Sequence, residues 1–283
     1  MKNIGFITNI EKDPALKDTL YLAGMILDRG CNVYMQKKYE GKLSLKINYV
    51  TDEEFIQSVD IIVVMGGDGT ILGASRLAAP ADIPILGINL GTLGYLADVE
   101  RSMSAVALEK VFKGDYTIEK RMMLKAYIEG KDEKPMLALN DVCITNSVLS
   151  RIITLGVEVS GAYINTFRSD GLIISSPTGS TAYNLSAGGP ILSPKTELIA
   201  LTHICPHALY SRPFVVSGSD VIRVNIKSGY EGIKCSCDGQ TDVGVKSGDT
   251  VVVEKADCYA SIIKTSELSF YDILRRKMVN VVI

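Results

Sequence analysis

The first hundred residues alternate short apolar runs with longer segments in which apolar residues recur every three or four positions. The runs "NIGFIT", "CNVYMQ", "VDIIVVM" and "IPILGIN" predict strands, whereas Asp13 to Arg29 and the segment "TILGASRLAA" predict helices. Within the third of these runs, Ile61 to Met65 are all apolar, which is typical of a strand that is buried on both faces. This alternation predicts an α/β domain with a doubly wound, mostly parallel sheet over residues 1–98.

From residue 99 onward the apolar positions recur with a period of two. Segments such as "LALNDVCITN", "IITLGVEVSG" and "DVIRVNIKSG" are short, rich in Val, Ile and Thr, and separated by turn-forming residues. Such segments are typical of antiparallel strands, so we expect a β-rich domain over residues 99–265. A helix is expected from Ser104 to Lys113, and another begins near Ser269. We expect the second helix, within residues 266–283, to return to the first domain.

Composition and charge narrow the choice of partner. The 283 residues are 47% hydrophobic and carry a formal net charge of −2, which is typical of a folded globular protein with no basic excess. No run of Lys and Arg suggests a nucleic-acid or membrane-surface footprint. No apolar run approaches the roughly 20 residues of a membrane helix, and the start "MKNIGFITNI" lacks the features of a signal peptide. We expect a cytoplasmic protein that binds small molecules.

The cysteines and histidines do not predict a metal site. The six cysteines include one C-x-C pair and no C-x-x-C pair, so neither a zinc knuckle nor a disulfide framework is supported. The two histidines, His203 and His207, have helical spacing, but Pro206 between them argues against a regular helix. We therefore expect no protein-held metal ion.

A glycine-rich loop, "GGDGT", follows the apolar run and precedes a predicted helix. The turn and the helix N-terminus bring backbone N–H groups together, which is a common arrangement for binding phosphate. The loop lacks the lysine of a phosphate-loop ATPase, and Asn89 stands where a dinucleotide-binding enzyme would carry an acid after the next strand. The predicted phosphate-binding residues are Gly66, Gly67, Gly69 and Thr70, with the helix beginning at Thr70.

Asp68 lies inside this loop, although a carboxylate repels phosphate. Asp68 could accept a proton from a hydroxyl group that attacks a phosphoryl group, or it could hold Mg²⁺ at that group. Either role indicates phosphoryl transfer. The alternative is that Asp68 occupies a tight turn, where Asp is common without any chemical role.

A second polar cluster lies in the segment "RSDGLIISSPTGSTAYNLSAGGPIL". Its donors and acceptors are Arg168, Asp170, Ser176, Thr178, Ser180, Thr181, Tyr183, Asn184 and Ser186. The piece "STAYNLSA" predicts two helical turns capped by Ser180. The density of polar groups around one tyrosine favours a ligand site, and the alternative is a structural crossover loop.

The loop "GGDGT", the pair Asn140-Asp141 and the segment "DGLIISSPTGSTAYNLSAGGP" occur in this order along the chain. Together they resemble the NAD kinase family over essentially the whole length. "GGDG" alone is shared with phosphofructokinases and lipid kinases, whereas the long segment is far more specific. The resemblance implies the two-domain architecture of that family. It also implies ATP-dependent phosphorylation of the 2′-hydroxyl of the adenosine ribose of NAD, which gives NADP.

The resemblance also assigns roles to individual residues. It implies that Asp68 acts on the 2′-hydroxyl as a general base or by positioning it, and that Gly69 approaches the substrate closely. It implies that Asn140 and Asp141 bind NAD, with Asp141 at a ribose hydroxyl. Many family members carry Asn-Glu at this pair, and the shorter Asp141 reaches about one methylene less far. The remaining implied NAD contacts are Arg151, Arg168, Asp170, Thr181, Ala182, Tyr183, Asn184, Leu185, Ser186 and Gln240, with Cys205 as a further candidate.

The resemblance further implies Mg²⁺ or Mn²⁺ with ATP, no tightly bound prosthetic group, and a homodimer or homotetramer. It leaves open whether polyphosphate replaces ATP. Two rival functions remain. A lipid kinase is supported by "GGDGT" alone, but no amphipathic basic surface for membrane docking is evident. A nucleotide sensor would bind NAD without consuming ATP.

Overall fold

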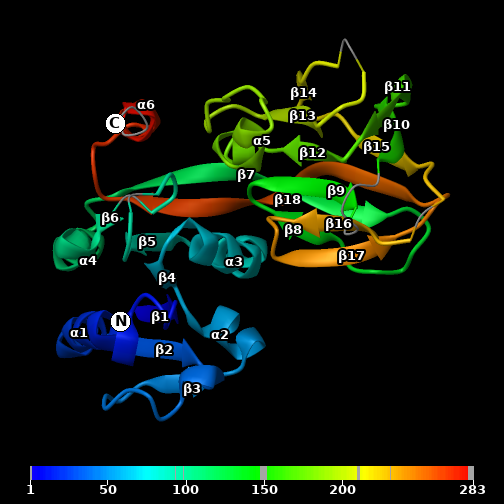
Figure 1. Cartoon of the computed structure of the whole chain (residues 1–283). Helices are drawn as coiled ribbons and strands as arrows, with labels where there is room; N and C mark the ends of the chain where they lie inside the picture. The colour runs from blue at the N-terminus through cyan, green and yellow to red at the C-terminus, as the bar shows by residue number, and fades with distance from the viewer. Residues whose placement is uncertain are drawn as a thin grey trace. The chain divides into compact units, whose positions relative to one another are not determined.

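The computed structural model describes residues 2–92, 94–97, 99–146, 152–208, 211–229 and 231–279. The chain forms two compact units, which are coloured by residue number in Figure 1. Unit 1 comprises residues 1–120 and 259–283, and unit 2 comprises residues 121–258. These bounds differ from the predicted divisions after residues 98 and 265.

Unit 1 contains a parallel sheet with helices between its strands. Its main elements are β1 (Asn3–Thr8), α1 (Lys17–Asp28), β2 (Asn32–Gln36), β3 (Asn48–Val50), α2 (Asp52–Ser58), β4 (Ile61–Gly66), α3 (Asp68–Ala78), β5 (Ile85–Asn89), β6 (Val99–Glu100), α4 (Ser104–Lys113) and α6 (Phe270–Val279). The strand order is β3-β2-β1-β4-β5, and β6 and the end of β18 (Thr250–Lys264) also pair with β5 in parallel. The order reverses between β1 and β4, which confirms the predicted doubly wound sheet.

The core of unit 1 explains where this unit ends. All six residues of β4 are buried, as its continuous apolar run predicts. Leu108 and Val111 of α4 are also fully buried, in one cluster with Leu22 and Ile26 of α1. Because α4 contributes to this core, the chain leaves unit 1 only after the helix and not at residue 98.

The first helix begins later than the sequence predicts. A 3₁₀ turn over Pro14–Leu16 precedes α1, because Ala15 and Leu16 adopt positive φ angles of 58° and 54°. The Asp13 carboxylate accepts hydrogen bonds from the backbone N–H groups of Asp18 (3.0 Å) and Thr19 (2.9 Å). Asp13 is therefore not the first residue of the helix but an acceptor for the free N–H groups of its first turn.

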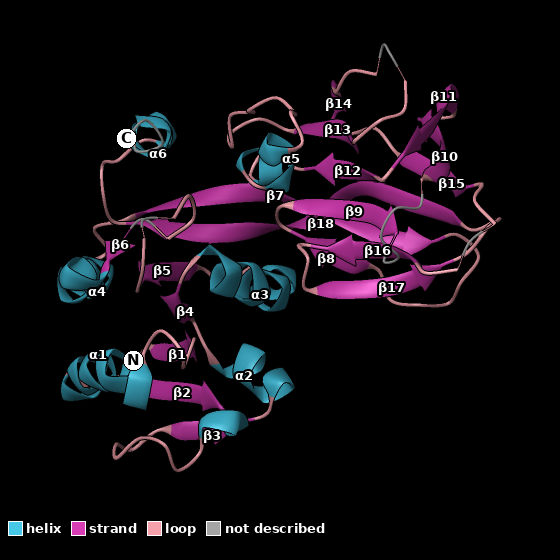
Figure 2. Cartoon of the chain, viewed as in Figure 1, coloured by secondary structure: helices cyan, strands magenta, loops and turns pink. Residues whose placement is uncertain are grey.

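Unit 2 consists almost entirely of strands, as Figure 2 shows. One sheet has the order β14-β13-β12-β9-β16-β17, and its pairs are antiparallel. A second group has the order β11-β10-β15-β18, with β7 beside β18 and β8 beside β7. The strands are β7 (Thr117–Ile128), β8 (Met136–Ala138), β9 (Asp141–Asn146), β10 (Ile153–Val159), β11 (Ala162–Ser169), β12 (Gly171–Ser175), β13 (Leu198–Ile204), β14 (Phe214–Ser217), β15 (Ile222–Ile226), β16 (Ile233–Cys237) and β17 (Thr241–Val245). The predicted β-rich half is confirmed.

The polar segment between β12 and β13 does not form the predicted two-turn helix. It contains a 3₁₀ turn (Gly179–Thr181) and the short helix α5 (Tyr183–Ser186), separated by the non-helical Ala182. Ser180 is fully buried, donates to the carbonyl oxygen of Pro177 (2.7 Å) and accepts from the N–H of Leu192 (2.9 Å). The prediction of Ser180 as a helix cap is wrong, because its hydroxyl group ties the two ends of the segment together.

The last helix, α6, begins at Phe270, one residue after the predicted start near Ser269. The Ser269 hydroxyl accepts a hydrogen bond from the N–H of Asp272 (3.2 Å), which is the geometry of a helix N-cap. Phe270 lies with its ring centre 6.2 Å from that of Tyr95, and the Lys277 ammonium lies 4.4 Å from the same Tyr95 ring. Helix α6 therefore packs on the loop after β5. No helix in the described residues is both long and apolar enough to cross a membrane.

Candidate active site

The glycine loop joins β4 to α3 at the carboxyl end of the sheet in unit 1. Helix α3 begins at Asp68 and not at Thr70, with Gly67 at the N-cap position. A Cβ atom on Gly66 would lie 2.3 Å from the Thr70 hydroxyl oxygen, and one on Gly67 would lie 2.9 Å from the Lys12 ammonium nitrogen. Glycine at these positions therefore leaves space for Thr70 and Lys12.

The Asp68 carboxylate is held by the backbone of the loop after β5. Its Oδ2 atom accepts a hydrogen bond from the N–H of Tyr95 (2.8 Å), and its Oδ1 atom accepts from Leu96 and Ala97 (3.2 Å each). A Cβ atom on Gly94 would lie 1.9 Å from Oδ1, so this position has no room for a larger residue. A carboxylate has about four lone-pair directions, so three N–H groups leave one for a further donor. The Asp68 carboxylate is therefore held in place and can still accept one more hydrogen bond.

The sequence predicts a role for Asp68 but does not reveal the groups that hold its carboxylate. The donors are backbone N–H groups of three consecutive residues, and such groups leave no signature in the side chains. Asp68 is also the first residue of α3, where the helix dipole favours a negative charge.

In unit 2, Asn140 and Asp141 lie where β9 begins. The carboxylate of Asp238 accepts hydrogen bonds from the N–H groups of Leu139 (3.0 Å), Asn140 (2.7 Å) and Asp141 (3.2 Å). Asp238 donates its own N–H to the carbonyl oxygen of Asp141 (2.9 Å). Gln240 lies in the same turn, with its N–H bonded to the carbonyl oxygen of Cys237 (3.0 Å). The structure thus brings the turn of Gln240 to the Asn140-Asp141 pair.

Asp238 was missed from the sequence, because it lies almost a hundred residues beyond the backbone that it holds. The "DG" at Asp238 signals a turn, but a turn signal does not name the partner of its side chain. The positive φ of Asp238, 54°, fits this tight position.

Asp141 is buried and its charge is disfavoured. Burial is the main reason that its pKa is raised to about 6, and the charge of Asp238 raises it further. The Cys143 thiol, two residues along the same strand, donates to Oδ1 of Asp141 (3.2 Å) and opposes this shift. Burial raises the pKa of the Cys143 thiol as well, so this donor stays protonated.

The segment after β12 forms hydrogen bonds with the backbone at the Asn140-Asp141 pair. Ser176 donates its hydroxyl to the carbonyl oxygen of Leu139 (2.5 Å) and its N–H to that of Asn140 (2.9 Å). A Cβ atom on Gly179 would lie only 2.0 Å from the carbonyl oxygen of Asn140. The two specific motifs of the second half therefore form one cluster.

Tyr183 projects from α5 beside this cluster. Its side chain is 45% exposed, and partial burial of the ring is the main reason that its pKa is raised. Leu185 and Ser186 on the same helix are also exposed. The segment thus presents an exposed aromatic ring on a short helix.

Asn184 differs from its neighbours because it is fully buried. Its Nδ2 atom donates to the carbonyl oxygens of Ser180 (3.1 Å) and Pro190 (3.0 Å), and its Oδ1 atom accepts from the Thr202 hydroxyl (2.6 Å). A Cβ atom on Gly189 would lie 2.0 Å from that Oδ1 atom. The Asn184 side chain therefore holds the segment together, and a direct contact with NAD would require it to exchange one of these bonds.

The remaining predicted contacts are dispersed around β11 and β12. Arg168 and Asp170 are exposed on either side of the junction of these strands, and Thr181 and Ala182 are half-buried. Arg168 lines a cavity of about 310 Å³ together with His207. Cys205 is exposed with a φ of 45°. Arg151 lies outside the described residues.

Comparison with known proteins identifies the chain. The ATP-NAD kinase N-terminal domain matches residues 4–116, and the ATP-NAD kinase C-terminal domain matches residues 139–265. The chain belongs to the ATP-NAD kinase family. It is 40% identical over 280 residues to the NAD kinase of Caldanaerobacter subterraneus subsp. tengcongensis, covering 98% of this chain and 99% of that protein. It is 40% identical over 280 residues to the NAD kinase of Moorella thermoacetica, covering 98% and 89%.

Solved structures of NAD kinases and NADH kinases share the fold. Yeast NADH kinase in complex with NADH superposes with a TM-score of 0.87 at 23% identity, over 99% of this chain and 88% of that one. An NAD kinase from Archaeoglobus fulgidus in complex with ATP gives 0.76 at 25% identity, over 99% and 98%. The predicted fold and function are confirmed: this member of the family is an ATP-dependent enzyme that phosphorylates NAD to NADP.

For this NAD kinase, the raised pKa of Asp141 predicts a pH-dependent stability. The neutral carboxyl group contributes stability that is fully present below its ordinary pKa of 3.8 and is lost as the pH rises through about 6. Asp141→Asn is neutral at every pH. Its free energy of unfolding should therefore rise relative to the parent protein by about 2 kcal/mol between roughly pH 4.5 and 7.5, measured by urea titration. The exposed Asp132→Asn serves as the control, and a difference between Asp141→Asn and parent that does not change with pH would contradict the prediction.

Proposed function

We propose that Asp68 accepts or orients the 2′-hydroxyl of the adenosine ribose of NAD during phosphoryl transfer. The observation that carries the proposal is the trio of N–H groups that fixes the carboxylate and leaves one lone-pair direction free. A hydroxyl group that donates to this direction becomes a better nucleophile as its proton moves to Asp68.

In this step the 2′-oxygen of NAD forms a bond to the γ-phosphorus of ATP. The bond from that phosphorus to the β–γ bridging oxygen breaks and ADP leaves, while the hydroxyl proton passes to the carboxylate of Asp68. The glycine loop and the start of α3, with Gly66, Gly67, Gly69 and Thr70, bind the phosphate groups through backbone N–H groups. Such positioning supplies most of the acceleration in phosphoryl transfer.

Unit 2 supplies the NAD contacts in this proposal. The Asp141 carboxylate accepts from a ribose hydroxyl group, and Asn140, held in place by Asp238 and Ser176, contributes polar groups beside it. The exposed ring of Tyr183 offers a face on which a nicotinamide or adenine ring can stack. The other predicted contacts, including Arg151, Gln240 and Cys205, remain candidates for the same substrate.

We also propose that Mg²⁺ or Mn²⁺ arrives with ATP. Among the described residues there is no group of three or more His, Cys, Asp or Glu side chains that could hold a metal ion. The oxygens of Asp68 already accept N–H groups, so the nucleotide phosphates are the better ligands for a hard cation. When bound, the cation neutralises the charge that develops on the phosphates.

Two further parts of the proposal concern the setting of the enzyme. The six cysteines are all free thiols, which fits the reducing environment of the cytoplasm. Strand β11 lies at the end of its sheet and exposes Tyr163 and Ile164, which are 60% and 43% accessible. Among the described strands none pairs with the outer edge of β11, and such an edge with exposed apolar side chains supports assembly into a homodimer or homotetramer.

A coupled assay tests the reaction and its requirement for a divalent cation. The protein is incubated with NAD, ATP and Mg²⁺, and NADP is followed with a dehydrogenase that accepts only NADP. NADP should form only when all three are present, should stop with EDTA and should resume with excess Mn²⁺. Formation of NADP that persists in EDTA would overturn the role of the cation, and NAD binding without turnover would support the sensor.

A further inference from the structure

The Cys143 side chain lies next to the Asp141 carboxylate on one face of strand β9. The two residues are two positions apart, and alternate residues of a strand point to the same side of the sheet. In the register of the sheet, Cys143 lies opposite Ile173 of β12 and Ser236 of β16, so neighbouring strands flank it on both sides. Only 5% of Cys143 is exposed. The sheet therefore holds this thiol in a fixed position beside Asp141.

The thiol donates a hydrogen bond to the carboxylate. Its sulfur atom lies 3.2 Å from Oδ1 of Asp141. Burial raises the pKa of the Cys143 thiol, and the neighbouring charge of Asp141 raises it further, so the sulfur keeps its proton and acts as the donor. Among the residues that the structure describes, no donor reaches the other carboxylate oxygen, Oδ2. One oxygen of Asp141 is thus engaged, and the other can accept from a ligand.

The remaining groups around Asp141 do not favour its charge. The titratable groups that interact with this carboxylate are Cys143 of β9, Asp238 in the turn after β16 and Tyr183 of α5. Asp238 adds a second negative charge, and Tyr183, whose pKa partial burial raises, is neutral near pH 7. On β12 the residue opposite Asp141 is the uncharged Ser175. Within this set, Cys143 is the group that stabilises the charged carboxylate, because its hydrogen bond lowers the pKa of Asp141.

The binding of a ribose hydroxyl group favours the charged form of Asp141. A charged carboxylate accepts stronger hydrogen bonds than a neutral carboxyl group. NAD should therefore bind more tightly when Asp141 has lost its proton, and its affinity should fall as the pH drops below the Asp141 pKa of about 6. A donor that lowers this pKa extends NAD binding to lower pH.

We propose that Cys143 is a positioning residue for NAD, which orients the Asp141 carboxylate through Oδ1, stabilises its charged form and leaves Oδ2 for the ribose hydroxyl. The proposal rests on the proposed function, since it explains how Asp141 is prepared for the substrate. The thiol does not touch NAD in this arrangement and keeps its proton throughout. Cys143 therefore sets the lower limit of the pH range in which the enzyme binds NAD well.

The pH dependence of NAD binding in Cys143→Ala and Cys143→Ser tests the proposal. The Kd for NAD is measured by calorimetric titration of the intact protein between roughly pH 5 and 8, without ATP, so that ionisation of the ATP phosphates does not contribute. In the parent, the Kd should be constant at high pH and rise below about pH 6. In Cys143→Ala this rise should begin at higher pH. The Kd at pH 6 should exceed that of the parent by about 2- to 10-fold, the size of one lost hydrogen bond.

Turnover separates positioning from chemistry. With saturating NAD, ATP and Mg²⁺, the kcat of Cys143→Ala should equal that of the parent, because Asp68 and the glycine loop are unchanged. The KM for NAD should change with pH in the same direction as the Kd. A lower kcat with an unchanged KM for NAD would contradict a role in binding.

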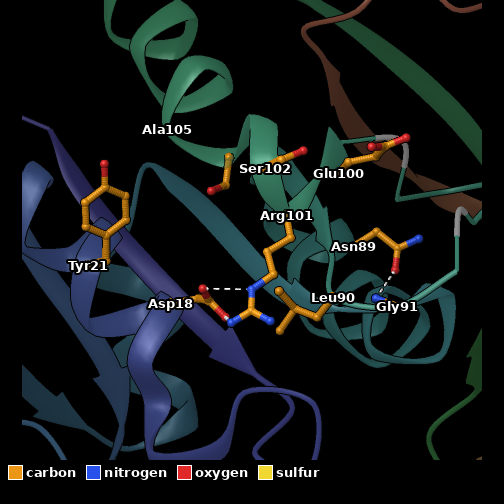
Figure 3. Close-up of a pocket in the computed structure, with 10 residues that line it drawn as sticks. Asp18, Tyr21, Asn89, Leu90, Gly91, Glu100, Arg101, Ser102 and Ala105 are labelled. Atoms are coloured by element: carbon orange, nitrogen blue, oxygen red, sulfur yellow. Dashed lines mark hydrogen bonds and ion pairs between the residues drawn. The ribbon is translucent and has the colours of Figure 1, made fainter.

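Cys143→Ser keeps a donor at this position, so the pH at which its Kd rises should not exceed that of the parent. Cys235→Ala is the matched control for a buried thiol. Cys235 lies opposite Ile144 in the register of β16 and β9, so its side chain is on the other face of the sheet from Cys143. Asp18→Asn is the control for a lost carboxylate: Asp18 pairs with Arg101 at 2.7 Å in a pocket of unit 1, which Figure 3 shows. Both controls should keep the pH dependence of the parent.

A Kd that rises at the same pH in Cys143→Ala as in the parent would overturn the proposal. An equal shift in Cys143→Ser, or in either control, would overturn it as well, because the loss of the donor would then not be the cause. Failure of the proposed function looks different: Asp141→Asn would bind NAD as the parent does at every pH. If Asp141→Asn removes the pH dependence and the Cys143 variants leave it unchanged, the role of the thiol alone fails.

Discussion

Asp68→Asn is expected to lower the kcat for NAD phosphorylation by about 10²- to 10⁴-fold, the usual contribution of a general base. An amide cannot take the proton of the 2′-hydroxyl. In the parent protein both carboxylate oxygens accept N–H groups from residues 95–97. In the variant one of these oxygens is replaced by an NH₂ group, which cannot accept such a hydrogen bond. The measurement is steady-state turnover in the coupled assay with saturating ATP, Mg²⁺ and NAD.

Two controls separate chemistry from folding in this experiment. Asp28→Asn, at the exposed end of α1, removes the same charge without touching the glycine loop and should retain full activity. The NAD affinity of Asp68→Asn should stay close to that of the parent, since the proposed NAD contacts of unit 2 are intact. Unchanged turnover in Asp68→Asn would remove this carboxylate from the mechanism.

The largest structural effect is expected from Gly179→Ala. The new Cβ atom would lie 2.0 Å from the carbonyl oxygen and 2.4 Å from the carbonyl carbon of Asn140, which are backbone atoms. These atoms are held by Ser176 and Asp238, so the clash must move the whole turn. We expect a loss of about 1–3 kcal/mol in the free energy of unfolding, the usual cost of overpacking, measured by urea titration.

The same displacement should weaken NAD binding, because it moves the Asn140-Asp141 pair. Gly244→Ala is the matched control: Gly244 lies in β17 of the same unit, and no atom lies within 4 Å of its added Cβ. That variant should keep both its stability and its NAD affinity. If Gly179→Ala bound NAD as the parent does, the contact between the segment after β12 and Asn140 would not shape the site.

The sequence predicted the elements whose pattern is set by burial. The run of β4 is apolar because both of its faces are covered, and the alternation of the second half reflects strands with one face toward the core. The predictions failed where the hydrogen bonds of a single side chain determine the local backbone conformation. Asp13 accepts the N–H groups of α1 instead of joining the helix, and the hydroxyl of Ser180 bridges Pro177 and Leu192.

The candidate site shows the same division. Asp68 and Tyr183 could be named because their side chains differ in kind from the glycines and small residues around them, whereas Asp141 was named by the resemblance to the NAD kinase family. The groups that hold them could not. The N–H groups of residues 95–97 have no side-chain signature, and Asp238 meets the N–H groups of residues 139–141 only after distant strands come together. The chemical type of a side chain can be read from the sequence, whereas the groups that hold it in place are known only from the fold.

Helix α6 contacts a residue that holds the Asp68 carboxylate in place. Through Phe270 and Lys277 it contacts Tyr95, whose N–H group donates to Asp68. Phe270, 175 positions beyond Tyr95, therefore affects the position of the carboxylate that is proposed to accept the hydroxyl proton. Removal of α6, or fusion of a bulky tag to it, should therefore change kcat, although no residue that touches the substrate has changed.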